Sequence, residues 1–428
     1  MLRPIRGTKD FSIIDCQLFN TIISQMKSQM NLYNIDEISV PIFEHEELFS
    51  TSVGELSDIV QREMYKVNSN NLKRESSEKV VLRPESTTSV MRFISSNNLI
   101  YDMPKRFFTY GPMFRYERPQ KGRLRQMNQF SVELLGYDSS FIDAELIKCA
   151  QDCLNSIGIN PYRLEINTLG DVKTRENYRQ ILINYYEKHI NGLSNESKNK
   201  MYKNPLRIFD SKFECDQEII NDAPKILEYL SYESRKFFEK VMNYLSALSV
   251  DFCINDKLVR GLDYYSDTVF EFKIDSFGAQ STILAGGRYD SLSQKIISKK
   301  IPAVGWSLGI DRAMMMIEES YQSPQKANNI GIVVFADEND TAMKEALIIA
   351  TKIRRIKLNC EIISEQTLSK CLKMANNRNI SICVILGPEE VSRQECIVKN
   401  MQKSETQLTI STSNIEQEFI SIKEKLLI

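Results

Sequence analysis

Histidine is nearly absent from this chain, because among 428 residues only His45 and His189 occur. Zinc sites and catalysis by a serine or cysteine nucleophile both need histidines in polar surroundings. The nine cysteines are scattered, and no two of them form a C-x-x-C pair. We therefore expect no protein-bound zinc or other metal-ligand set, and a structural or surface role for each histidine.

Glycine-rich phosphate loops and long apolar runs are also missing. Neither G-x-x-x-x-G-K-[ST] nor G-x-G-x-x-G occurs. No apolar run approaches the roughly 18 residues of a membrane span, and the start, MLRPIRGTKDF, lacks the apolar core of a signal peptide. We therefore expect a cytoplasmic protein without a membrane partner. Because the net charge is −1, any nucleic acid must be bound by local basic patches.

The length and texture of the chain predict several domains. A chain of this length favours two or three. Residues 172–250 show helical patterns with few strand signals, which predicts a helical insertion between two parts of one domain, 1–171 and 251–322. The polar stretch 320–329 predicts a linker. Residues 328–428 then alternate as β-α-β-α-β, which is typical of a small α/β domain with a mostly parallel sheet.

One stretch, residues 114–133, combines a strand pattern with unusual chemistry, reading FRYERPQKGRLRQMNQFSVE. Its loop carries four cations, Arg118, Lys121, Arg123 and Arg125. A period-two row follows, namely Met127, Gln129, Ser131 and Glu133. The planar fork of a guanidinium matches phosphate oxygens at two points, so the pattern favours a polyphosphate site. A solvated basic hairpin is the alternative.

Two further strings are polar where apolar residues would be expected. Glu85 with Thr87 can hold an ammonium group, although a helix cap explains them equally well. Arg260 precedes two adjacent tyrosines, Tyr264 and Tyr265, which on a strand would point to opposite faces.

Two more strings repeat this theme. Gly286 and Gly287 either admit a ligand to a strand backbone or mark a bulge. Arg312, in the first turns of an apolar helix, is either a ligand-binding cation or a surface residue. Together, an ammonium acceptor and several bidentate cations predict a site for an amino acid beside a nucleotide.

These strings resemble the motifs of one family. FRYERPQKGR and GWSLGIDR resemble the second and third class-defining motifs of class II aminoacyl-tRNA synthetases. RGLDYY and AGGRYD resemble two signatures specific to histidine. The likeness runs from RGTKD near the start to IVKN near the end. Over nearly its whole length, the chain resembles the histidyl-tRNA synthetases.

The resemblance implies a fold and a reaction. The fold is α+β, with a catalytic domain built on an antiparallel sheet with flanking helices, the helical insertion, and a C-terminal α/β anticodon-binding domain. The enzyme joins L-histidine to ATP, forming histidyl-adenylate and pyrophosphate, and then transfers histidine to the 3′ end of tRNA-His. Mg²⁺ accompanies the ATP phosphates. The region around Pro41 resembles the first class motif, which implies a homodimer.

The resemblance also implies residue roles. Catalysis falls to Arg115 and Arg260, on opposite sides of the reacting centre. ATP is bound by Arg115, Arg123 and Arg312. Histidine is bound by Glu85, Ser86, Thr87, Arg115, Gln129, Glu133, Arg260, Tyr264 and Tyr265. Gln129 and Glu133 share a strand face about 13 Å apart, so one can serve each end of the substrate. No residue is a candidate base for the transfer step.

Two rival families and one departure from the pattern remain. The regulatory subunit of ATP phosphoribosyltransferase shares the catalytic fold, but it lacks a C-terminal domain and an RGLDYY-type segment. Class II synthetases for threonine or proline carry different strings at these positions. Ser131 stands where the family usually has glycine, which predicts a slightly raised pocket floor.

Overall fold

The computed structural model describes residues 2–53, 57, 59–67, 79–120, 122–274, 281–318, 321, 330–336, 340–401 and 407–426. Lys121 and the expected linker 320–329, apart from Tyr321, lie outside the described residues. The chain divides into two compact units, Met1–Tyr321 and Gln322–Ile428. Each unit is described by itself.

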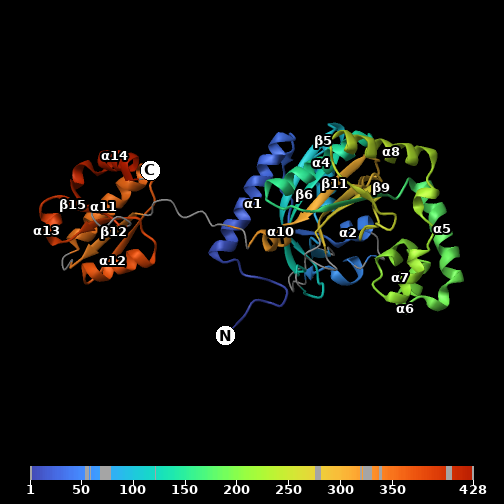
Figure 1. The fold of residues 1–428 in the computed structure, drawn as a ribbon, viewed down its shortest axis with the longest axis horizontal. Helices are drawn as coiled ribbons and strands as arrows, with labels where there is room; N and C mark the ends of the chain where they lie inside the picture. The colour runs from blue at the N-terminus through green and yellow to red at the C-terminus, as the bar shows by residue number, and fades with distance from the viewer. Residues whose placement is uncertain are drawn as a thin grey trace. The chain divides into compact units, whose positions relative to one another are not determined.

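The first unit is built on an eight-stranded sheet with the order β1-β5-β6-β11-β10-β9-β7-β8 (Figure 1). Its strands are β1 (Asp36–Glu37), β5 (Lys105–Phe114), β6 (Gln126–Leu135), β7 (Arg163–Thr168), β8 (Cys253–Ile254), β9 (Ser266–Lys273), β10 (Thr282–Arg288) and β11 (Ala303–Gly309). Neighbouring strands run antiparallel except at the two edges, where β1 pairs with β5 and β8 with β7 in parallel. The expected antiparallel catalytic sheet is confirmed.

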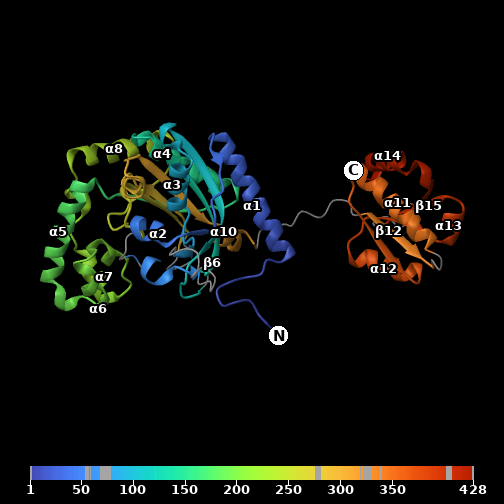
Figure 2. The same cartoon turned by 180° about the vertical axis from the view of Figure 1, so that it is seen from behind.

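Helices cover both faces of this sheet. On one face α1 (Ile13–Leu32), α4 (Ser140–Ser156) and α8 (Tyr232–Ala247) share a core with alternate residues of β6, Phe130 and Val132 among them. On the other face α2 (Glu46–Val53), α3 (Thr87–Ser96) and α9 (Leu292–Ile297) enclose a second core, and α2 and α3 can be followed in Figure 2. The alternation along β6 sends its polar row toward α3.

A small three-stranded sheet completes this region. The small sheet has the order β2-β4-β3, with β2 (Phe43–His45), β3 (Lys66–Val67) and β4 (Val80–Leu82). The pattern of residues 35–43 predicts a strand that Pro41 stops, at a sheet edge or an interface. The chain pairs at β1, an edge strand of the large sheet, and again only from Phe43 in β2, so the strand is shorter than expected. Pro41 lies in the gap, where it needs no backbone donor for a strand partner.

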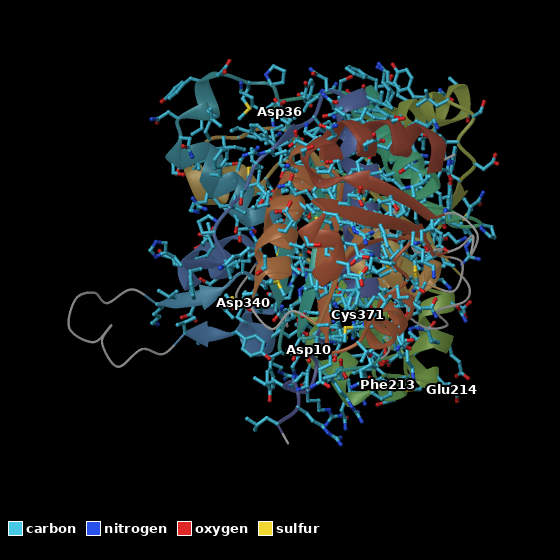
Figure 3. The ribbon with its side chains drawn as sticks, turned by 90° about the vertical axis from the view of Figure 1, so that its left-hand side faces the viewer. Asp10, Asp36, Phe213, Glu214, Asp340 and Cys371 are labelled. Carbon is cyan, nitrogen blue, oxygen red and sulfur yellow. The ribbon has the colours of Figure 1, made fainter. Side chains whose placement is uncertain are left out.

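The helical insertion has its own small core. Its helices are α5 (Val172–Lys188), α6 (Asn195–Met201), the short 3₁₀ turn η5 (Pro205–Asp210) and α7 (Glu214–Asn221). Tyr178, Met201 and Ile220 are buried together there. Phe213, about half exposed, is labelled in Figure 3 beside Glu214, the first residue of α7. The chain returns through α8, which packs on the core shared with α4.

The second unit is a five-stranded sheet with the order β13-β12-β14-β15-β16. The strands are β12 (Ile330–Phe335), β13 (Cys360–Glu365), β14 (Ile382–Leu386), β15 (Glu395–Asn400) and β16 (Gln407–Ser411). The helices are α11 (Thr341–Arg355), α12 (Leu368–Asn377), α13 (Pro388–Ser392) and α14 (Ile415–Leu426). The β-α-β-α-β part is parallel as expected. The last two strands are antiparallel, so the sheet is mixed.

Two observations concern the scarce histidines and the lack of long apolar runs. His45 and His189 are both exposed. Within the described parts of the chain, no helix combines the length and the apolar character needed to cross a membrane.

A buried ion pair fastens α4 to the sheet. Arg288, at the end of β10, is 1% exposed and bonds to the Asp143 carboxylate of α4, which is fully buried. Its guanidinium also pairs with Asp290 at 3.1 Å and donates to the carbonyls of Tyr137 and Ser139. Arg288 of the AGGRYD string therefore has a structural role, because its guanidinium donors are used within the fold.

Replacing Arg288 with alanine leaves the Asp143 carboxylate buried without its cation. We expect the free energy of unfolding to fall by about 3–5 kcal/mol. Trp306, the single tryptophan and a buried residue of β11, provides a fluorescence signal for this unit in urea titrations of the full chain. As the control, Lys200→Ala removes a more exposed pair with Glu196 and should cost less than about 1 kcal/mol. Equal losses in the two variants would contradict the structural role of Arg288.

Candidate active site

The polar row of β6 forms the floor of the candidate site. Glu133 is 1% exposed, and its carboxylate accepts a hydrogen bond from Thr87 Oγ1 at 2.6 Å and another from the Tyr289 hydroxyl. Gly305 is the partner of Glu133 on β11, and a Cβ there would overlap the Glu133 carboxylate. The glycine therefore makes room for a buried acid.

Burial changes the protonation of this acid. Desolvation raises the pKa of Glu133 to about 8, with a smaller contribution from the nearby Glu85 carboxylate, against the lowering effect of the bonds from Thr87 and Tyr289. Burial therefore favours the protonated form of this carboxyl in the ligand-free protein. In that form it can donate one hydrogen bond and accept others.

The start of α3 supplies the neighbouring wall. Both carboxylate oxygens of Glu85 accept backbone N–H groups, from Thr87 at 2.8 Å and Thr88 at 2.9 Å. In the ligand-free structure the contacts of Glu85 are thus those of a helix cap. The Thr87 hydroxyl donates to Glu133 instead.

A chain of buried hydroxyls crosses the same floor. Ser86 donates to Ser131 at 2.8 Å, and Ser131 lies 2.8 Å from the hydroxyl of Ser307 on β11. Ser131 is fully buried. Its hydroxyl is satisfied by these two neighbours, which ties the start of α3 to the middle of the sheet.

The adjacent tyrosines are arranged differently from the expectation. Tyr264 and Tyr265 precede β9 rather than lying on it, and their ring centroids are 4.8 Å apart. The expectation that they point to opposite faces is therefore wrong, because strand alternation does not apply in a turn. Tyr289 completes the cluster, with its ring 5.6 Å from that of Tyr264.

The two glycines of β10 serve this cluster. The strand pairing shifts register between Gly287 and Arg288, so the bulge alternative is correct. A Cβ at Gly287 would lie 2.9 Å from the Tyr265 ring and closer still to a carbonyl of β9. Close packing of the aromatic wall therefore requires glycine there.

The hairpin loop brings two of the expected arginines together around one carboxylate. Glu117 lies 2.9 Å from Arg123 Nε and 3.8 Å from an Arg115 Nη. Arg115 is anchored by its Nε, which donates to the Pro84 carbonyl at 2.8 Å. Arg123 is about half exposed.

Arg312 and Arg260 are joined through Thr282 of β10. Arg312, in α10 (Ile310–Ile317), donates to the Thr282 carbonyl at 2.6 Å and to the Gly122 carbonyl at 2.8 Å. The Thr282 hydroxyl donates to Glu271 at 2.8 Å, and Glu271 also binds the Arg260 guanidinium. Burial, followed by the charges of Arg123 and Arg115, lowers the pKa of Arg312. The expected cations thus belong to one electrostatic cluster.

Gln129 ends the polar row opposite Glu133. Its Oε1 is buried and has no hydrogen-bond partner. A buried acceptor without a donor is unfavourable, so this atom is suited to the donor group of a ligand.

Three contributors had no assigned role from sequence. Tyr289 was visible in AGGRYD, yet only its contact with Glu133 reveals its part. Glu271 interrupts the apolar strand β9, and that interruption was the available signal. Glu117 stands among cations in the loop. Across the described residues, no group of three or more His, Cys, Asp or Glu side chains is placed to hold a metal ion.

Comparisons with known proteins identify the family of the chain. The family model described as histidyl-tRNA synthetase matches residues 7–313, and an anticodon binding domain model matches residues 330–422. A curated protein of Wolbachia pipientis wMel, named histidine–tRNA ligase, is 41% identical over 97% of this chain and 98% of its own. One of the same name from Gluconobacter oxydans is 38% identical over 95% of each chain.

Solved structures show the same likeness. The structure of apo S. aureus histidyl-tRNA synthetase matches with a TM-score of 0.79 and 27% identity, covering 98% of this chain and 100% of the other. A structure titled ATP phosphoribosyltransferase regulatory subunit/histidyl-tRNA synthetase, from Bacillus halodurans, has a TM-score of 0.62, covering 90% of this chain and 97% of the other. At 19% identity the latter shows the fold alone.

The relatives match through both the catalytic and the anticodon-binding regions, and they share more than a third of their residues with this chain. The chain belongs to the histidyl-tRNA synthetase family of class II aminoacyl-tRNA synthetases.

Proposed function

We propose that the polar face of β6 and its walls bind L-histidine beside ATP, form histidyl-adenylate, and pass the histidine to the 3′ end of tRNA-His. Family membership supplies the reaction class. The observation that carries the site is the pair of chemically different groups on one strand face. Gln129 offers an unpartnered acceptor at one end, and Glu133 a buried carboxyl at the other.

The imidazole of histidine would face Glu133. A neutral imidazole has one donor and one acceptor, and a buried carboxyl with a raised pKa can match either. Tyr264, Tyr265 and Tyr289 would enclose the imidazole ring. Their three rings pack against one another, and Tyr289 bonds the Glu133 carboxyl. An amino acid without these polar groups would leave Glu133 without a ligand partner, which disfavours its binding.

The α-ammonium of histidine would bind at the opposite end. Gln129 Oε1 provides a free acceptor, and Glu85 provides negative charge close to α3. Glu85 keeps acceptor capacity after its two backbone bonds, because a carboxylate has about four lone-pair sites. Ser86 would act through Ser131, which separates the two ends of the row.

Arg115, Arg123 and Arg312 would bind ATP, with Arg115 at the α-phosphate. The histidine carboxylate attacks the α-phosphorus, and pyrophosphate leaves. Arg115 and Arg260 would stabilise charge on the transferring phosphoryl group, in a step that depends mostly on positioning. Glu271 holds Arg260 in advance, so little reorganisation is needed.

Magnesium would bind with the ATP phosphates. Mg²⁺ commonly takes one or two carboxylates together with substrate phosphates, which suits a site with few acidic groups around several arginines. When bound, it would neutralise phosphate charge. The steps assigned to Arg115, Arg260 and Gln129 use only this chain's own side chains.

The second unit would bind the anticodon of tRNA. The anticodon binding domain model covers residues 330–422. In α11, Lys352 and Arg354 use their side chains to bond the carbonyls of Thr412 and Cys360. Arg355 and Lys357 are exposed and suit phosphate contacts. We place the domain boundaries at 1–171 and 251–322 for catalysis, 172–250 for the insertion and 328–428 for the anticodon domain.

A homodimer would cover apolar side chains near the first class motif. Phe43 is 60% exposed and Ile42 is 37% exposed, beside the interrupted strand at Pro41. On α1, Ile13 and Leu32 are also exposed. Two copies related by a two-fold axis would bury these groups against one another.

Arg260→Ala tests the catalytic assignment. We expect histidine-dependent ATP–pyrophosphate exchange to fall by about 10²–10³-fold, because a charge aimed at the transferring phosphoryl group is lost. Trp306 fluorescence should stay native. Arg235→Ala, at an exposed site on α8, should retain full exchange. Near-normal exchange by Arg260→Ala would remove this residue from the mechanism.

Glu133→Ala tests the imidazole contact. The KM for histidine should rise roughly 10–100-fold, as expected for loss of a hydrogen bond to a charged or polarised group. The KM for ATP should change less than about threefold, because ATP makes no contact with this carboxyl. Glu196→Ala, an exposed glutamate of α6, is the control. Equal rises in both KM values would argue against the assignment.

Deleting residues 328–428 tests the division of labour. Histidine-dependent pyrophosphate exchange should persist, since every proposed adenylation residue lies in the first unit. Aminoacylation of tRNA-His should fall by at least about tenfold at limiting tRNA, because phosphate and base contacts to the anticodon are lost. Full-rate charging by the truncated chain would refute anticodon binding by this unit.

A further inference from the structure

A second cavity, of about 330 Å³, opens where the helical insertion meets the loop before β9. Its walls come from the first turns of α5, from η5 and the residues before it, and from the segment containing Arg260 and Tyr265. Gln129, Glu133 and Glu85 do not line it. The cavity thus shares Arg260 and Tyr265 with the candidate active site, whereas the polar row of β6 does not line it.

The cavity is strongly cationic. Five of its lining side chains are positive, namely Arg175, Arg179, Lys203, Arg207 and Arg260. Only Glu176 and Asp263 are negative, and Asp263 is already paired with Arg207 at 3.0 Å. Arg260 is likewise paired, with Glu271, so the positive charge that an anion would meet comes from Arg175, Arg179 and Lys203.

Two of these arginines carry buried donors without acceptors. The Nε atoms of Arg175 and Arg260 are buried and have no hydrogen-bond partner. Within the described residues, no other arginine nitrogen shares this condition. Arg175 is held in place by its Nη1, which donates to the Tyr265 carbonyl at 2.8 Å. An anion bound at the Nε edge of either guanidinium would supply the missing acceptor.

The remaining lining is apolar. Leu169, Val172, Pro205, Leu206 and Leu262 provide it. Such a surface suits a flat ring rather than a bare inorganic ion, and the volume lies within the usual range for small-molecule sites. The combination of guanidinium edges with an apolar wall matches a phosphate joined to a base.

We propose that this cavity is a second nucleotide site, which takes the phosphate of a mononucleotide at Arg175 and Arg179 and its base against the apolar wall. The nucleotide is either free or the terminal residue of an RNA chain. The ligand would contact the segment that carries Arg260 and Tyr265, so occupancy would bear on two groups of the candidate active site.

The first experiment titrates AMP into the full chain by calorimetry. The active site is filled beforehand with histidyl sulfamoyl adenosine, a stable analogue of histidyl-adenylate, and this step rests on the proposed function. We expect one further equivalent of AMP to bind. Absence of binding up to about 1 mM AMP would overturn the proposal.

Variants identify the cavity as the place of binding. Arg179→Ala combined with Lys203→Ala should weaken this second AMP site by about tenfold or more, because one proposed phosphate contact and a second cation of the cavity lining are lost. Lys173→Ala is the matched control, since Lys173 lies on α5, as Arg179 does, but does not line the cavity. Equal affinity in the double variant and the control would overturn the assignment. If the analogue itself fails to bind, the proposed function has failed, and AMP titrations of the same variants still decide on the cavity.

Competition then distinguishes the two sources of the nucleotide. Displacement of AMP by tRNA-His, but not by the same tRNA lacking its terminal adenosine, assigns the cavity to the RNA end. Retention of AMP in the presence of intact tRNA assigns it to a free nucleotide.

Discussion

The buried carboxyl of Glu133 is the constraint around which the catalytic unit is arranged. A fully buried acid must find hydrogen-bond partners or lose its charge. Thr87, at the start of α3, and Tyr289, after β10, provide those partners, and Gly305 provides the space. Two distant segments, the start of α3 and the segment that follows β10, are therefore tied to β6 by one side chain. The same burial that raises its pKa also makes it selective for a ligand with matching polar groups.

The arginines are ordered by carboxylates in a comparable way. Glu117 gathers Arg115 and Arg123, and Glu271 holds Arg260 beside Thr282. Cations at such short range would otherwise repel one another and move apart. In the proposed function, the acids would keep them together before ATP binds, which would preorganise the site for developing negative charge. Arg288 shows the contrast, because two aspartates and two carbonyls satisfy it completely within the fold.

At a few positions the sequence pattern left alternatives open or predicted a different local structure. The bulge at Gly287 and the cap at Glu85 were both open alternatives. The bulge depends on the pairing of β10 with β9, whereas the cap is local and uses the backbone N–H groups of Thr87 and Thr88. Tyr264 and Tyr265 were expected on opposite faces because a strand was assumed, whereas the chain turns there. Pro41 interrupts a strand pattern that is otherwise regular.

By itself the sequence determined the family, the antiparallel catalytic sheet and the identity of the cations. Motif strings and strand periodicity are local properties, so they can be read without coordinates. Only the tertiary structure decided that Tyr289 bonds Glu133, that Glu271 holds Arg260, and that the insertion forms a cationic cavity with the loop before β9. Glu133 and Tyr289 are 156 residues apart and Arg260 and Glu271 are 11 apart, and neither contact follows from a strand or helix period. They depend on how the segments pack in three dimensions, which no local pattern encodes.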